Sequence, residues 1–91
     1  MELPEPRAEQ PQQTPEEIAE ENRKIRRLQV MMSLVMAEIS QDPNLTVEEA
    51  SQLAAGAKRT ALAMFPDKEL AYDLIYKPRL QRLMKERFRL Q

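Results

Sequence analysis

The 91-residue sequence contains no cysteine, no histidine and a single glycine. The absence of cysteine excludes disulfide bonds and thiol chemistry and is typical of a reducing compartment, so we expect a cytoplasmic protein. Without histidine or cysteine, the serines have no evident base beside them for nucleophilic catalysis. Gly56 alone cannot form a glycine-rich phosphate-binding loop. The sequence therefore predicts that the protein is not an enzyme, with no catalytic residue, no cofactor and no evident small-molecule substrate.

Carboxylates are the only remaining candidates for metal ligands. Glu16, Glu17, Glu20 and Glu21 fall within two turns of a predicted helix. Carboxylate metal sites in helical bundles usually recruit histidines as well, and negative charge near a helix N-terminus is favourable by itself. We therefore expect no metal site and interpret these acids as the solvated start of a helix.

Long hydrophobic runs are also missing. The densest apolar run, residues 30–37, is far shorter than the roughly 20 residues that a membrane-spanning helix requires. The N-terminus is acidic and lacks the basic and then apolar pattern of a secretory signal. We expect no transmembrane segment.

The most informative pattern in the sequence is a repeat of apolar residues every seven positions. Ile18, Ile25, Met32 and Ile39 form this repeat, and Leu28 and Val35 occupy the intermediate positions. Such spacing predicts a helix with an apolar stripe along one side. The second half of this segment is apolar on most sides, so it is expected to be covered all round.

Local signals define where this first helix begins and ends. Residues 1–13 form a Pro-, Gln- and Glu-rich tail with little to bury, which predicts a flexible acidic segment. Thr14, Pro15 and Glu17 then match a helix start with a capping box. The helix is expected to run to about Gln41, a length of roughly 40 Å. We therefore divide the chain into a tail, 1–13, and a single helical domain, 14–91.

A second helix is predicted from the same capping pattern. Thr46 and Glu49 form another capping box, and the helix is expected to end near Met64 or Phe65. Its apolar face is mostly alanine, which would let a neighbouring helix come close. Gly56 lies beside this face, and it either serves the same close approach or is an exposed, tolerated glycine.

A third helix is expected to begin at Pro66 or Asp67. Its first half carries three apolar residues, with two tyrosines at the margins of the face: Leu70, Leu74 and Ile75, then Tyr72 and Tyr76. Pro78 lacks a backbone donor and should kink or split the helix. Leu80, Leu83, Met84 and Phe88 form the stripe of the last segment. The predicted fold class is all-α: a small bundle of three helices, the third kinked or split at Pro78, with a disordered N-terminal tail.

The first helix is longer than the others and needs more cover than they can give. This predicts a protein–protein interaction or assembly module that either self-associates or docks a protein partner through the long N-terminal helix. The predicted partner-binding residues are Leu28, Met31, Met32, Val35 and Ile39, with Arg82, Lys85 and Arg89 as a secondary charged contact.

The basic C-terminal segment allows other interpretations. Residues 74–91 carry six basic residues against one acid, whereas residues 1–21 carry seven acids against one base. The bases can simply suit a helix C-terminus, pair with an acidic protein surface, or contact nucleic acid or an anionic membrane. Nucleic-acid binding, with help from a second cluster at 23–27, is the alternative function. A net charge of −1 argues against it, unless folding brings the two basic clusters onto one surface.

Overall fold

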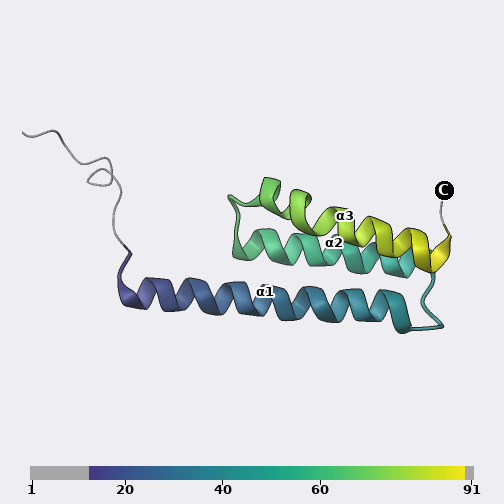
Figure 1. The fold of residues 1–91 in the computed structure, drawn as a ribbon, viewed down its shortest axis with the longest axis horizontal. Helices are drawn as coiled ribbons and strands as arrows, with labels where there is room; N and C mark the ends of the chain where they lie inside the picture. Colours follow the sequence, from purple (N-terminus) through teal and green to yellow (C-terminus); the bar gives the residue numbers. More distant parts are fainter. Residues whose placement is uncertain (1–12, 90–91) are drawn as a thin grey trace, which may run out of the picture.

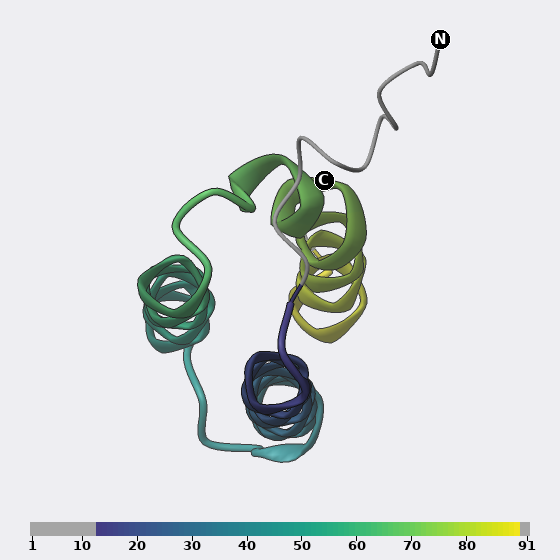
Figure 2. The same cartoon turned by 90° about the vertical axis from the view of Figure 1, so that its left-hand side faces the viewer.

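A computed structural model of the chain describes residues 13–89, which form three α-helices joined by short connections. Helix α1 spans Pro15–Gln41, α2 spans Val47–Met64 and α3 spans Glu69–Phe88. Adjacent helices run antiparallel, so α1 and α3 point the same way (Figure 1). Viewed end-on, the three helices occupy the corners of a triangle (Figure 2). The predicted flexible tail, 1–13, lies outside the described residues except for Gln13.

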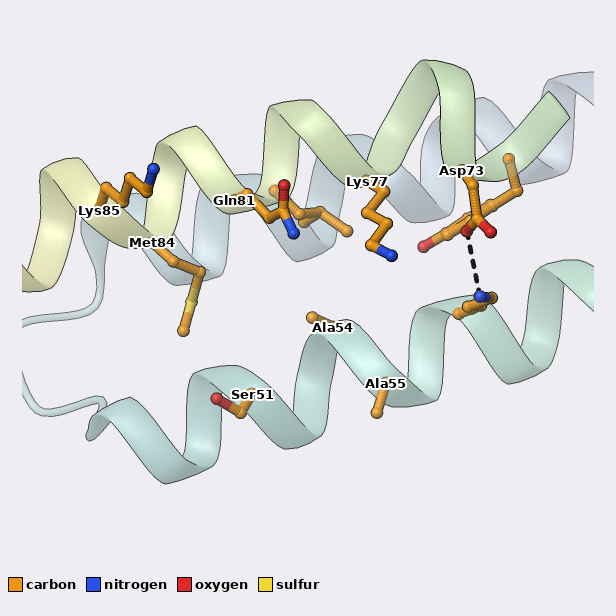
Figure 3. A pocket seen from close by; sticks show the side chains of 11 residues that line it. Ser51, Ala54, Ala55, Asp73, Lys77, Gln81, Met84 and Lys85 are labelled. Atoms are coloured by element: carbon orange, nitrogen blue, oxygen red, sulfur yellow. Dashed lines mark ion pairs between the residues drawn. The ribbon is translucent and has the colours of Figure 1, made fainter. Parts of the chain in front are cut away.

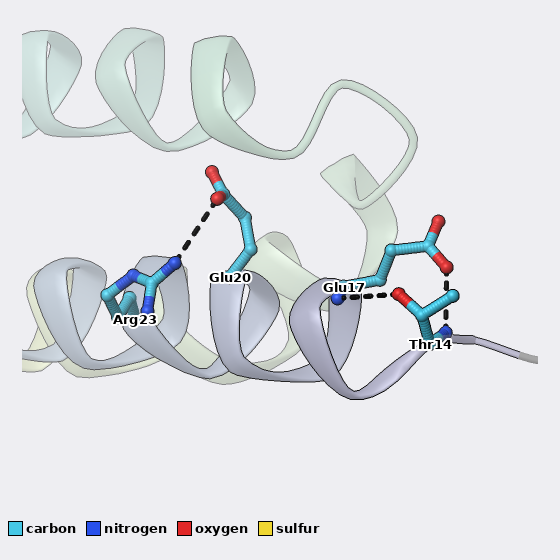
Figure 4. Close-up of polar contacts among 4 residues, drawn as sticks. All are labelled: Thr14, Glu17, Glu20 and Arg23. Carbon is cyan, nitrogen blue, oxygen red and sulfur yellow. Dashed lines mark hydrogen bonds and ion pairs between the residues drawn. The ribbon is translucent and has the colours of Figure 1, made fainter.

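The starts of α1 and α2 confirm the predicted capping boxes. The Thr14 hydroxyl accepts a hydrogen bond from the Glu17 backbone N–H at 3.1 Å, and the Glu17 carboxylate accepts one from the Thr14 N–H at 2.8 Å (Figure 4). Thr46 and Glu49 repeat both bonds at 3.1 and 2.9 Å. Each box satisfies backbone donors that a helix N-terminus leaves free, so both helices begin where the sequence places them.

Helix α3 corrects two predictions. It begins at Glu69, because Pro66 and Asp67 form a turn that the Lys68 N–H closes onto the Phe65 carbonyl at 3.1 Å. It also continues through Pro78 to Phe88, so the predicted kink or split is wrong. A proline in a helix interior costs about 3 kcal/mol. Tyr72 and Leu80 are buried on either side of Pro78, and each contributes about 1.5–3 kcal/mol of burial that offsets this cost.

The apolar face of α3 also differs from the prediction. Tyr72 is buried, whereas Leu70, Leu74 and Ile75 are 73%, 69% and 49% exposed. In an unbroken helix, Tyr72 lies on the same broad face as Leu80, eight residues further on, so both can enter the core. The Tyr72 hydroxyl also finds a partner inside, the sulfur of Met32. The face that includes Leu70 and Leu74 therefore remains in solvent.

The core lies along the axis between the three helices. Its buried side chains come from every helix: Met32, Ile39, Ala50, Ala57, Ala61, Tyr72 and Leu80. The predicted stripe of Leu83, Met84 and Phe88 packs against them. The buried residues of α2 are all alanines, in agreement with its predicted alanine-rich apolar face.

Within residues 13–89, none of the helices combines the length and the apolar character needed to cross a membrane.

Candidate interaction site

The apolar stripe of α1 is covered along only half of its length. Met32 and Ile39 are 0% exposed, but Ile25 and Ile18, one and two heptads before Met32, are 40% and 46% exposed. Helix α1 has 27 residues against 18 in α2 and 20 in α3, and its N-terminal part extends past the α2–α3 hairpin (Figure 1). All side chains of residues 13–23 are exposed. The stripe therefore continues beyond the core that buries its second half.

An apolar groove lies where the stripe emerges from the bundle. We call it the α1–α3 groove; its volume is about 490 Å³. Its apolar lining comes from all three helices and the connection after α2: Ile25, Leu28, Ala61, Leu62, Phe65, Ala71, Tyr72, Ile75 and Tyr76. The rings of Tyr72 and Tyr76 lie 5.5 Å apart and form one wall. A groove of this lining suits apolar side chains from another protein segment.

The predicted partner-binding residues of α1 lie in different surroundings. Met32 and Ile39 are completely enclosed in the chain's own core. Met31 and Val35 are half-buried and line a shallow groove between α1 and α2. Among the five, only Leu28 lines the α1–α3 groove. In this fold Met32 and Ile39 belong to the core of the bundle. The exposed part of the stripe, at Ile18 and Ile25, lies nearer the N-terminus.

The predicted basic residues at the end of the chain are exposed, and two of them, Arg82 and Lys85, border different grooves. Arg82 borders a groove shared with Met36 and Ser40 of α1. Lys85 borders a second groove, which lies between α2 and α3 and which we call the α2–α3 groove (Figure 3). Arg89 ends α3 with a left-handed backbone, at a φ of 55°. Arg82 and Lys85, three residues apart on a continuous helix, share one side of α3.

Arg87, which sequence reasoning missed, has a defined structural role. Its guanidinium donates a hydrogen bond to the backbone carbonyl of Asp42 at 2.6 Å and lies 4.9 Å from the ring centre of Phe88. Asp42 caps the C-terminus of α1, so this bond satisfies a carbonyl at that helix end. The residues are 45 positions apart, and no local pattern indicates that they meet.

An ionic cluster joins α2 to α3 beside the α2–α3 groove. The Lys58 ammonium lies 3.0 Å from an Asp73 carboxylate oxygen and 3.1 Å from one of Glu69. The hydrogen bonds to Asp73 and Glu69 raise the pKa of Lys58 above its ordinary value. Burial raises the pKa of the neighbouring Tyr72. The groove has a volume of about 560 Å³, and Ala54 and Met84 line it from opposite helices (Figure 3).

The two basic clusters lie toward opposite ends of the bundle. The cluster at 23–27 flanks Ile25, which meets Tyr72 and Ile75 in the first half of α3. Arg82, by contrast, lies beside Met36 in the second half of α1. The two clusters therefore lie along different halves of α1, and the nucleic-acid interpretation stays a prediction.

Across residues 13–89, no three acidic side chains are grouped closely enough to hold a metal ion. Comparison of the chain with protein-family models, with curated proteins and with solved structures finds no match.

Proposed function

We propose that this protein is a non-enzymatic helical interaction module that binds a protein surface through the N-terminal half of α1 and the α1–α3 groove. A single observation carries the proposal. Ile18 and Ile25 belong to the stripe that is fully enclosed at Met32 and Ile39, yet both remain exposed. Exposed apolar surface beside a groove is typical of interaction sites.

The electrostatics of the site support a protein partner. The rim of the α1–α3 groove carries both signs of charge, from Glu21, Asp67 and Lys68. Mixed charge around an apolar centre resembles the polar rim of protein–protein interfaces. A cytoplasmic location and the absence of an enzymatic activity stay predictions of this proposal.

The proposal is tested by capturing partners with the full-length chain. Wild-type protein and an Ile25→Ser/Ile75→Ser variant are immobilised and exposed to extract from the source cells, supplemented with a differently tagged copy of the chain. Both substitutions alter groove side chains that are already half exposed, so the variant should keep its helical circular dichroism. A Val30→Ser/Leu34→Ser variant, altered on an exposed part of α1 outside the groove, is the matched control.

We expect at least one protein, or the tagged copy itself, to be retained by the wild type and the control and lost with the groove variant. Identical retention by all three proteins, or retention by none, would contradict the proposal.

A further inference from the structure

One side of α3 combines exposed leucines with a lysine. Leu70 and Leu74 are 73% and 69% exposed, and neighbouring exposed apolar side chains are typical of interaction surfaces. At the helical spacing of three and four residues, both share one side of α3 with Lys77 and Gln81. Lys77 and Gln81 line the α2–α3 groove. The leucines therefore extend the α3 edge of this groove toward the start of the helix.

The α2–α3 groove is an apolar furrow between two antiparallel helices. Met84 points from α3 toward α2, where Ala54 lies on the facing side (Figure 3). Leu80 also lines the groove. On α2 the groove is bordered mostly by small side chains, those of Ser51, Ala54 and Ala55. Small side chains on one wall let another helix lie close, so the groove suits the apolar face of a further helix.

The charge of the groove is positive along α3. Lys58, Lys77 and Lys85 line it, against the single acid Asp73. Lys58 is already engaged, because Asp73 lies 3.0 Å and Glu69 3.1 Å from its ammonium. Lys77 and Lys85 are exposed, and among the described residues neither forms an ion pair. Two cations therefore remain for an acidic partner, although the chain as a whole has a net charge of −1.

The two lysines set the spacing that such a partner must match. Lys77 and Lys85 are eight residues apart, about 12 Å along the helix axis. Carboxylates seven or eight residues apart on a second helix have nearly the same separation. Nucleic acid carries no apolar stripe for the lining of the groove, and a flat membrane surface does not enter a furrow between two helices. The surface therefore favours an acidic amphipathic helix.

We propose that the α2–α3 groove binds an acidic amphipathic helix of another protein, with carboxylates at Lys77 and Lys85 and an apolar stripe between α2 and α3. This surface is separate from the proposed α1 site, since only Tyr72 lines both grooves. One helix against one groove gives a small interface that buries less than about 1,200 Å² and binds weakly. Because opposite charges select the partner, salt should weaken the binding.

Two synthetic helical peptides of opposite charge provide the test. Both carry leucine and alanine along one face. The acidic peptide has glutamates seven residues apart at the edge of this face, and the basic peptide has lysines in their place. Each is labelled with a fluorophore, and its binding to the full chain is measured by fluorescence anisotropy from about 0.01 M to about 1 M salt.

Two charge-reversal variants locate the binding site. Lys77→Glu/Lys85→Glu reverses the charges at the groove. Arg26→Glu/Arg27→Glu makes the same change of net charge on α1, outside the α2–α3 groove, and is the matched control. All four side chains are exposed, so both variants should keep their helical circular dichroism.

We expect the wild type to bind the acidic peptide at least about tenfold more tightly than the basic one at low salt, and this preference should shrink as salt is added. Lys77→Glu/Lys85→Glu should reverse the preference, whereas the α1 control should keep it. Leu70→Ser/Leu74→Ser should weaken binding of the acidic peptide without reversing the preference, because it removes apolar contact and no charge.

The inference is overturned if the acidic peptide binds no more tightly than the basic one, or if Lys77→Glu/Lys85→Glu keeps the wild-type preference. It is also overturned if neither peptide binds while duplex DNA or phosphatidylserine vesicles bind through these lysines. Ile25→Ser/Ile75→Ser, altered in the α1–α3 groove, should bind the acidic peptide like the wild type. Loss of binding in this variant would place the peptide at the α1 site, which overturns the inference and leaves the proposed function standing.

Discussion

The hydroxyl of Tyr72 donates a hydrogen bond to the sulfur of Met32 at 3.9 Å inside the core. The residues come from α3 and α1, and both are almost completely buried. The Tyr72 ring fills the core, while its one polar atom has a weak acceptor. Tyr72→Phe should therefore lower the free energy of unfolding by less than about 1 kcal/mol, and Tyr72→Ala by about 3–5 kcal/mol. Urea unfolding measures both, and equal losses would show that the hydroxyl, not the ring, matters.

Met32 should be intolerant of charge. Met32→Lys places an ammonium group where the side chain is 0% exposed, at a cost of several kcal/mol that is enough to unfold a small domain. Leu34→Lys, two residues along α1 and 66% exposed, is the matched control and should melt near the wild-type temperature. Circular dichroism melting compares them. Similar melting of both variants would show that α1 is rotated from the position described.

Replacing Pro78 should stabilise the protein. The proline is exposed and lies inside a continuous helix, so Pro78→Ala restores a backbone donor for the Leu74 carbonyl without disturbing the core. We expect the free energy of unfolding to rise by about 1–3 kcal/mol. Thermal unfolding measures the change. A lower melting temperature would mean that the proline ring makes a stabilising contact.

Gly56 should also accept a side chain. A Cβ at this position would meet only the guanidinium of Arg59, at an ordinary contact distance of 3.6 Å. The sequence allows two interpretations of Gly56: it serves a close approach between helices, or it is simply tolerated in the helix. The structure favours the second. Gly56→Ala should raise the free energy of unfolding by about 1 kcal/mol, the difference in helix propensity. A loss of stability in urea would point instead to a close approach at this position.

Stability should fall at high pH. The pKa values of Lys58 and Tyr72 are both raised in the folded chain above their ordinary values of 10.5 and 10.0. A raised folded-state pKa means that the unfolded chain loses its proton first, so this stabilisation is complete below pH 10 and is lost as the pH rises through the folded-state values. Urea unfolding from pH 7 to pH 11 tests this. Lys58→Met/Tyr72→Phe should flatten the decline, and an equally steep decline in this variant would assign it to other groups.

Local signals account for the parts of the fold that the sequence predicts well. Thr14 with Glu17, and Thr46 with Glu49, form capping boxes within four consecutive residues, so α1 and α2 begin where expected. Two of the errors in α3, the kink at Pro78 and the choice of its apolar face, have one cause. Treating Pro78 as a break uncouples the two halves of the helix, and Leu70 and Leu74 then look like a core face. Continuity through Pro78 keeps Tyr72 on the same broad face as Leu80 and turns the leucines outward.

The site was predictable only in part. The heptad of α1 is visible in the sequence, but how much of it stays exposed depends on where the α2–α3 hairpin ends. The sequence-based choice therefore included Met32 and Ile39, which the hairpin covers, and omitted Ile18 and Ile25. The bonds from Arg87 to Asp42 and from Lys58 to Asp73 join different helices, and no periodicity within one segment could reveal them.

The most direct test of the account is sedimentation equilibrium of the wild-type chain and of Ile18→Ser/Ile25→Ser, from about 1 µM to about 1 mM. If the uncovered stripe of α1 joins two copies, the wild type should shift from the mass of one chain to twice that mass as concentration rises. The variant should remain a folded monomer throughout. A wild-type chain that keeps the mass of one copy over the whole range and captures no other protein through the uncovered stripe would contradict the account.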